Sequence, residues 1–531
     1  MSHPPTTPWP GGQQPPNPAP QPFPQYAGAP QPQQYGGPPQ QPPYPAVAQG
    51  DLPPLAPRKR SRVPLVIVGV VVLALVAGGA AVALMLTRGG AMSAVKGLPV
   101  DTVAVLEVDL EPAASDLLAL KGIADKLPME TVGGGSVSSS AVEVDYKQVL
   151  YDLVAQDDLD YETDIKPWLG DSVAVALVDA RGASGVSELI AAPVVAVDTT
   201  DRARAEEFAR EHVAPDFGHF FVDDVLVMTP PDSTLTEEQV RRGSLADDPT
   251  YKADMAKMDG MLARAWYAPR AIELGIAEAD GNGTLASVPA GEVNRLRGSH
   301  GSFGLRVAED LVALDMRITA LVESPVGDVR SLAGGLSADS LGMAAVSIGN
   351  GVAGDVWRQL ADAGMESMLA DVGITSAGDL DALLGEQVAF SVDYLGNEPV
   401  VGAKLVSDDT SRQQRILRRL ESAMNQGEEL LEVEQEDRTS IVAFNQYVDD
   451  VADPQRSLAD LDSFKRIVDG PAQAVVFVNV DTLSGLPAFR DALAYSGGEQ
   501  ATEWVDAIDA AGVIGNVEGS TSVGSLRVLV R

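Results

Sequence analysis

Two serine motifs at a fixed interval are the first candidates for chemistry in this 531-residue chain. Ser244-Leu-Ala-Asp247 and Ser457-Leu-Ala-Asp460 are 213 residues apart, and an aromatic residue follows each at the same distance. A serine close to an acid could act as a nucleophile. The pattern is also typical of a helix start, where serine caps free N–H groups and the acid meets the positive end of the helix. We therefore predict a structural role for Ser244, Asp247, Tyr251, Ser457, Asp460 and Phe464.

A run of oxygen-bearing side chains is the candidate for a metal site. Glu278, Asp280 and Asn282 alternate as in a calcium-binding loop. An EF-hand requires a bidentate glutamate at its twelfth position, and counting from Glu278 that position is Pro289. Gly281-Asn-Gly283 is more typical of a hairpin turn between strands. These three residues are therefore weak metal candidates only.

Other reactive groups have the wrong spacing or lack their companions. His212 and His219 are seven residues apart, which matches neither helical ligation nor a known zinc pattern. Ser93 and Lys96 match the serine–lysine spacing of acyl-transfer enzymes, but no Lys-Thr-Gly follows in the chain. The chain has no cysteine, which excludes disulfides and thiolate sites. We predict no catalytic residue and no cofactor.

The charge of the chain is strongly asymmetric. Of 38 basic and 75 acidic residues, five basic residues and one acid lie before Gly89, so the remainder has a net charge of −41. Such a surface repels nucleic acid and anionic lipid headgroups, and it is compatible with divalent cations or cationic partners. The charge therefore excludes nucleic acid as a partner.

The amino-terminal part predicts a membrane anchor. Residues 1–57 are rich in proline and glutamine and predict a disordered segment. A basic stretch at 58–62 precedes 25 uncharged residues at 63–87, which is long enough for a transmembrane helix. The excess of basic residues before this helix places residues 1–62 in the cytoplasm. We therefore expect a single-pass protein of the cell membrane, with its carboxyl-terminal region outside the cell.

The exterior region follows one sequence pattern twice, in 97–325 and in 335–531. Asp164–Asp179 resembles Asp379–Tyr394, with Gly170 and Gly385 at matching places before a strand-like run. Pro193-Val-Val-Ala-Val is similarly matched by Pro399-Val-Val-Gly-Ala. Because these blocks and the serine motifs recur in one order, we interpret the exterior region as an internal duplication.

Two periodicities within each half indicate the fold class. Alternating or β-branched runs predict strands, and short turns such as Asp223-Asp224 predict antiparallel pairing. In the first half the strands are expected at 102–109, 172–179, 193–198, 220–228, 264–271, 303–307 and 311–318. Helices are expected at 201–212 and 245–258. The predicted fold is α+β, a tandem duplicated ectodomain with antiparallel sheets and packed helices, preceded by one transmembrane helix and a disordered tail.

The combination of a Pro/Gln-rich leader, a basic stretch, an apolar segment and a duplicated cysteine-free region with Ser-Leu-Ala-Asp resembles a known group. It is similar to a family of actinobacterial membrane-anchored proteins that contain a domain of unknown function. The resemblance covers roughly residues 60–531. The blocks at Ser244 and Ser457 are the most specific part of this resemblance. The resemblance implies a location at the cell surface, and it supplies no activity or catalytic residue.

The exterior region is large and folded, and it shows no recognisable set of catalytic side chains. This favours a non-enzymatic protein that binds an envelope component or a protein partner. Two alternatives stay open. One is an envelope hydrolase that uses an unrecognised carboxylate site, since Asp and Glu are the abundant acid–base groups. The other is transmembrane signalling through the proline-rich tail.

Overall fold

The computed structural model describes residues 93–531, except for 112, 129–146, 149–150, 152–158, 180–181, 191, 214–216, 282–292, 295, 320–326, 350, 363, 396–397 and 426–429. All sixteen strands of this part belong to one antiparallel sheet. The strands of the first half are β1 (Thr102–Asp109), β2 (Leu169–Val178), β3 (Val194–Thr199), β4 (Gly218–Val222), β5 (Val225–Thr229), β6 (Ala263–Tyr267), β7 (His300–Ala308) and β8 (Leu311–Thr319). Those of the second half are β9 (Gly342–Ser347), β10 (Gln387–Leu395), β11 (Glu398–Val406), β12 (Leu431–Glu436), β13 (Thr439–Phe444), β14 (Ala474–Asn479), β15 (Ile508–Glu518) and β16 (Thr521–Val530).

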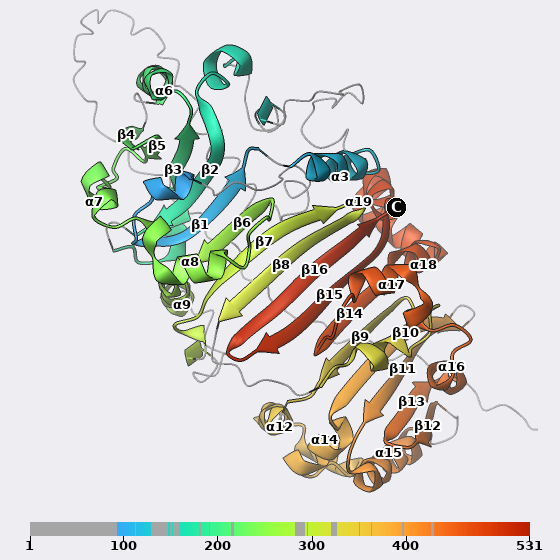
Figure 1. Ribbon diagram of the computed structural model, residues 1–531. Helices are drawn as coiled ribbons and strands as arrows, with labels where there is room; N and C mark the ends of the chain where they lie inside the picture. The colour runs from blue at the N-terminus through green and yellow to red at the C-terminus, as the bar shows by residue number, and fades with distance from the viewer. Residues whose placement is uncertain are drawn as a thin grey trace, which may run out of the picture. The chain divides into compact units, whose positions relative to one another are not determined.

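The two halves of the sheet have the same strand order. From one edge the order is β12-β13-β11-β10-β9-β14-β15-β16, and from the other edge it is β4-β5-β3-β2-β1-β6-β7-β8 (Figure 1). Each strand of the second half therefore takes the place of the strand numbered eight lower in the first half. The common order supports the interpretation of the chain as a duplication, which stays a prediction.

The predicted fold class is wrong, because the halves do not form separate sheets. β16 pairs with β8 from Thr521 opposite Thr319 to Leu529 opposite Leu311. This pairing satisfies the backbone N–H and C=O groups that β8 and β16 would otherwise expose as edge strands. The predicted transmembrane helix at 63–87 and the disordered tail at 1–57 lie outside the described residues. In the part of the chain that the structure describes, no helix has the length and apolar character needed to cross a bilayer.

One face of the sheet, which we name the covered face, packs against short helices in both halves. In the first half, Tyr251 and Met255 of α8 (Pro249–Met255) pack with Trp266 of β6. In the second half, Phe464 of α17 (Asp462–Ile467) packs edge-on against Phe477 of β14. The rings of Tyr251 and Trp266 form the matching edge-on pair, so the two aromatic pairs mark corresponding places in the halves. In the second half, α11 (Arg330–Gly334) and α16 (Val448–Ala452) also pack on this face.

The opposite face is covered unequally. In the first half, Leu120 and Ile123 of α3 (Ala114–Ala124) pack with Leu305 and Val307 of β7. In the second half, α15 (Thr410–Met424) covers only the outer strands, where its Leu417 packs with side chains of β10 to β13. The remaining helices are α5 (Val186–Ile190), α6 (Arg202–Phe208), α7 (Glu237–Arg242), α9 (Pro269–Gly281), α12 (Val352–Asp362), α13 (Glu366–Asp371), α14 (Ala377–Leu384), α18 (Val480–Ser484) and α19 (Pro487–Asp506).

Candidate functional site

A row of exposed apolar side chains crosses the opposite face in the second half. Phe390, Ala344, Val476, Val513 and Leu526 are successive register partners from β10 through β9, β14 and β15 to β16. The large side chains of this row and its neighbours are each 38–46% exposed. We name this set the open apolar face, and its members are Val346, Phe390, Val392, Val401, Val476, Val513 and Leu526.

The strands beneath the open apolar face carry apolar residues on both sides. Val475 and Phe477 point to the covered face, whereas Val476 and Val478 point to the opposite face. In the described chain, β9, β14 and β16 place no charged residue on the opposite face. An antiparallel sheet with one solvated face normally alternates apolar and polar residues, so this pattern is typical of a sheet that is covered on both sides. Large exposed apolar patches mark interaction sites.

The first half is less exposed at the corresponding positions, which range from the buried Val175 to the partly exposed Ala265 and Phe303. Val175 of β2 pairs with Leu106 of β1 in the way that Phe390 of β10 pairs with Ala344 of β9. Val175 is 6% exposed and Phe390 is 46% exposed. Because the strand order and the register agree, the difference lies in what packs on the sheet.

A helix that could cover this face packs elsewhere in the second half. α3 begins at Ala114, five positions after the end of β1, and α12 begins at Val352, five positions after the end of β9. α3 lies over β1 and β7, whereas α12 packs against α14, and its Trp357 joins the core formed by α14 and α15. The helix α3 thus covers Val108 in the first half, whereas α12 leaves the matching residue Val346 of the open apolar face exposed.

A second feature is a charged cluster buried on the covered face of the first half. Glu107 of β1 has no exposed surface, and its Oε2 accepts from Nη2 of Arg264 at 3.0 Å. The hydroxyl of Tyr251 donates to the other carboxylate oxygen. Burial raises the pKa of Glu107, and the charge of Arg264 with the two hydrogen bonds opposes this shift. Burial beside the Glu107 carboxylate also raises the pKa of the Tyr251 hydroxyl.

An aspartate–histidine pair adjoins this cluster. Oδ2 of Asp254 accepts from Nε1 of Trp266 at 2.9 Å and lies 2.6 Å from Nδ1 of His300. A carboxylate at Nδ1 favours the tautomer that carries its proton there, which leaves the Nε2 lone pair available. The side chains of Asp254 and His300 are 17% and 20% exposed. The carboxylate fixes the orientation of the imidazole, and sequence reasoning did not find either residue because 46 positions separate them.

The second half replaces the whole polar cluster with apolar residues. Trp266 corresponds to Phe477 by register, since each pairs with the matching positions of its two neighbouring strands. The same register matches Glu107, Arg264 and His300 with Ala345, Val475 and Ala510, which are apolar and buried. The 213-residue offset of the serine motifs matches Tyr251 and Asp254 of α8 with the buried apolar residues Phe464 and Ile467 of α17. The fold therefore forms without these charges.

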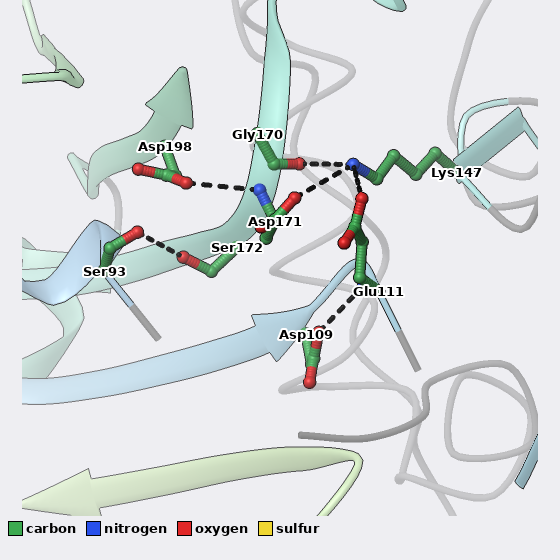
Figure 2. A network of polar contacts seen from close by, with 8 residues as sticks. All are labelled: Ser93, Asp109, Glu111, Lys147, Gly170, Asp171, Ser172 and Asp198. Atoms are coloured by element: carbon green, nitrogen blue, oxygen red, sulfur yellow. Dashed lines mark hydrogen bonds and ion pairs between the residues drawn. The ribbon is translucent and has the colours of Figure 1, made fainter. Parts of the chain in front are cut away.

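A third network lies where β1 and β3 end and β2 begins (Figure 2). Nζ of Lys147 donates to the carbonyl of Gly170 at 2.9 Å and contacts carboxylate oxygens of Glu111 and Asp171 at 3.1 and 3.3 Å. Oδ2 of Asp198 accepts from the backbone N–H of Asp171 at 3.2 Å. Glu111 and Asp171 are more than half exposed, and exposed ion pairs stabilise little. We assign this network a structural role in joining these strand ends.

The structure places the serine motifs at short turns before helices. Oγ of Ser244 accepts from the N–H of Ala246, and Asp247 forms an exposed ion pair with Lys252. In the second motif, the backbone N–H of Ser457 donates to Asp460 at 3.0 Å. Both serines form an isolated bridge to the segment that enters the first strand of their half, with Pro99 and Ser337 as partners. Tyr251 and Phe464 are both buried, and only the tyrosine has a carboxylate partner.

The weak metal candidates do not form a loop. Glu278 and Asp280 lie in α9, so the hairpin turn predicted at Gly281 is wrong at its first residue, and Asn282 lies outside the described residues. Glu278 contacts Ser187 through its carboxylate. His212 packs against Phe208, and His219 lies on β4 opposite Met228. In the described part of the chain, no group of three or more His, Asp or Glu side chains is arranged to hold a metal ion.

Comparison with known proteins adds one match. No curated protein and no solved structure matches the chain. The resemblance to a domain of unknown function is confirmed in its coarse form, over part of the predicted extent. Residues 66–216 match the model of a family described as a protein of unknown function, DUF3352.

Proposed function

We propose that this protein is a protein-binding module whose open apolar face receives an amphipathic helix of a partner protein. The single observation that carries the proposal is the uncharged, exposed row that begins at Phe390 and ends at Leu526. Hydrolase and signalling roles stay predictions.

The first half supplies the reason for choosing a helix as the occupant. There α3 places Leu120 and Ile123 on the face to which Leu106 and Val108 of β1 belong. Ala344 and Val346 hold the corresponding positions in β9 and are exposed. The open apolar face runs over six strands, or about 24 Å at the usual strand spacing. A partner helix of about 16 residues has that length.

Charge decides which kind of helix fits. Residues 89–531 have a net charge of −41, so a second copy of this chain would meet strong repulsion. A helix with lysine or arginine beside its apolar stripe would instead gain from electrostatic complementarity. The proposed partner is therefore basic as well as amphipathic.

The test titrates a fluorescent synthetic helix into the full chain and follows anisotropy. The probe has about 18 residues, with leucine on one face and lysine on the other. We expect saturable binding that Val476→Asp weakens at least tenfold, because the aspartate places a charge in the centre of the apolar row. The matched control is Val100→Asp, since Val100 is also exposed (47%) but lies in the first half.

Two further measurements keep the outcome unambiguous. A probe with glutamate in place of lysine should bind more weakly than the lysine probe. Equal binding of the lysine probe to the wild type, Val476→Asp and Val100→Asp would overturn the proposal. Sedimentation that shows a dimer dissociating on Val476→Asp would also overturn it, because a second copy would then be the occupant.

A further inference from the structure

The helix α15 concentrates arginines on a protein that is otherwise strongly acidic. Its solvent-facing side lines an open hollow of about 470 Å³. No acidic residue contributes to the described lining, which consists of Ser411, Gln414, Arg415, Arg418, Arg419 and Ser422.

Two of these arginines are not engaged by acids. Arg412, outside the hollow, pairs with Asp379 at 2.8 Å, and Arg418 pairs with Glu421 at 3.0 Å. Among the residues that the structure describes, neither Arg415 nor Arg419 forms an ion pair. They are four positions apart on one helix, a spacing at which like charges destabilise a helix. An anion bound between them would remove this repulsion.

The corresponding helix of the first half shows the usual arrangement. There, in α6 and the helical turn Ala209–Val213 that continues it, Arg204 pairs with Asp201 and Arg210 pairs with Glu206. Arg202 donates to the carbonyl of Asp223. The arginine face is therefore a property of the second half alone. It is not required for a helix at this place in the fold.

We propose that the arginine face of α15 binds a phosphate group of a phosphorylated ligand. The guanidinium groups of Arg415 and Arg419 offer two planar forks of donors, and Ser411, Gln414 and Ser422 add further donors at the rim. A single carboxylate can engage one such fork, whereas a phosphate has more acceptor oxygens and up to two charges.

The overall negative charge does not prevent this binding. At physiological ionic strength the Debye length is about 8 Å, so distant acids are screened while contacts within the hollow are not. This site uses residues other than those of the open apolar face. Either proposal can therefore fail without the other.

The experiment measures binding of inorganic pyrophosphate to the full chain by calorimetry at about 0.15 M salt. We expect saturable binding with a dissociation constant that rises at least tenfold in Arg415→Gln/Arg419→Gln. The matched control is Arg204→Gln/Arg210→Gln, which removes the same charge from α6 and the helical turn that continues it, and it should leave binding unchanged. Relief of the repulsion should leave the Tm of the first variant equal to or above that of the wild type.

A second arm separates the two sources of phosphate. Vesicles of phosphatidylcholine with and without phosphatidylglycerol are sedimented with the wild type and both variants. Binding to phosphatidylglycerol vesicles that Arg415→Gln/Arg419→Gln abolishes assigns the site to a lipid headgroup, and binding of pyrophosphate alone assigns it to a soluble phosphate ester. The proposal is overturned if neither probe binds the wild type, or if both variants bind equally well.

Discussion

Arg264 lies opposite Glu107 in the register of β6 and β1, and its Nη2 is 3.0 Å from a carboxylate that has no exposed surface. Taking two charges out of water is costly, and their attraction offsets the cost only when the geometry is good. The second half builds the same place from Ala345 and Val475, which carry no charge. The ion pair is therefore an addition to a fold that does not need it.

This relationship predicts a difference between breaking and replacing the cluster. Arg264→Val should lower the free energy of unfolding by roughly 3–5 kcal/mol, because the buried carboxylate loses its partner. The triple variant Glu107→Ala/Tyr251→Phe/Arg264→Val introduces apolar residues like those of the second half. It should lower the free energy of unfolding by less than Arg264→Val alone. Chemical denaturation followed by tryptophan fluorescence measures both. A triple variant less stable than Arg264→Val would contradict the expectation.

A second prediction concerns acid stability and Asp379. Burial alone would raise the pKa of this carboxyl, but hydrogen bonds from Thr375 and Ser376 and the guanidinium of Arg412 lower the pKa well below its usual range. A lowered folded-state pKa contributes stability above the unfolded value of about 3.9, and this contribution is lost as the pH falls. Asp379→Asn should therefore flatten the loss of stability below about pH 4. The control Asp371→Asn removes an exposed carboxylate and should keep the wild-type slope.

The aspartate–histidine pair predicts a defined tautomer. Asp254 should hold the proton of His300 on Nδ1, and ¹⁵N chemical shifts of the imidazole report which nitrogen is protonated. Asp254→Asn should reduce the Nδ1–H tautomer while keeping an acceptor for Trp266. Asp254→Leu should cost about 1–3 kcal/mol more than Asp254→Asn, since it leaves the indole N–H without a partner. Identical imidazole shifts in the wild type and Asp254→Asn would show that the carboxylate does not set the tautomer.

A fourth prediction uses a glycine that the repeated pattern singled out. Gly385 has a φ of 66°, and a Cβ at this position would collide with the carbonyl of Val406. Gly385→Ala should destabilise the protein by at least about 1–3 kcal/mol, the usual cost of a strained backbone position. Gly354 lies in α12 with open space around it, so Gly354→Ala should stabilise by up to about 1 kcal/mol. Thermal unfolding of both variants tests the pair.

Local features of the fold could be predicted from the sequence. The strand at Thr102–Asp109 has the predicted bounds, and the hairpin turns at Asp223-Asp224, where Asp223 adopts a φ of 52°. The strand expected at 264–271 is too long, because Pro269 begins α9 at a position where its missing N–H costs nothing. Alternation and turn residues act within a few positions, so they indicate single strands well.

Long-range features could not be predicted in this way. The two halves form one sheet because β8 pairs with β16, which lies about 200 residues further along the chain. No local sequence pattern encodes that pairing. The polar cluster likewise joins Glu107, Asp254 and His300 from distant segments. The open apolar face did leave a signal, the unbroken apolar run Ala474–Val478 in an antiparallel strand. Such a run could have been interpreted as a strand with both faces apolar.

The pairing of β8 with β16 also has a consequence for biosynthesis. When β8 leaves the ribosome, its partner strand is still about 200 residues from being translated. At roughly 5–20 residues per second, the growing chain carries an unpaired edge for about 10–40 seconds. During that interval the nascent first half can pair with other chains, so the yield of folded protein should depend on elongation rate and on chaperones that shield β8.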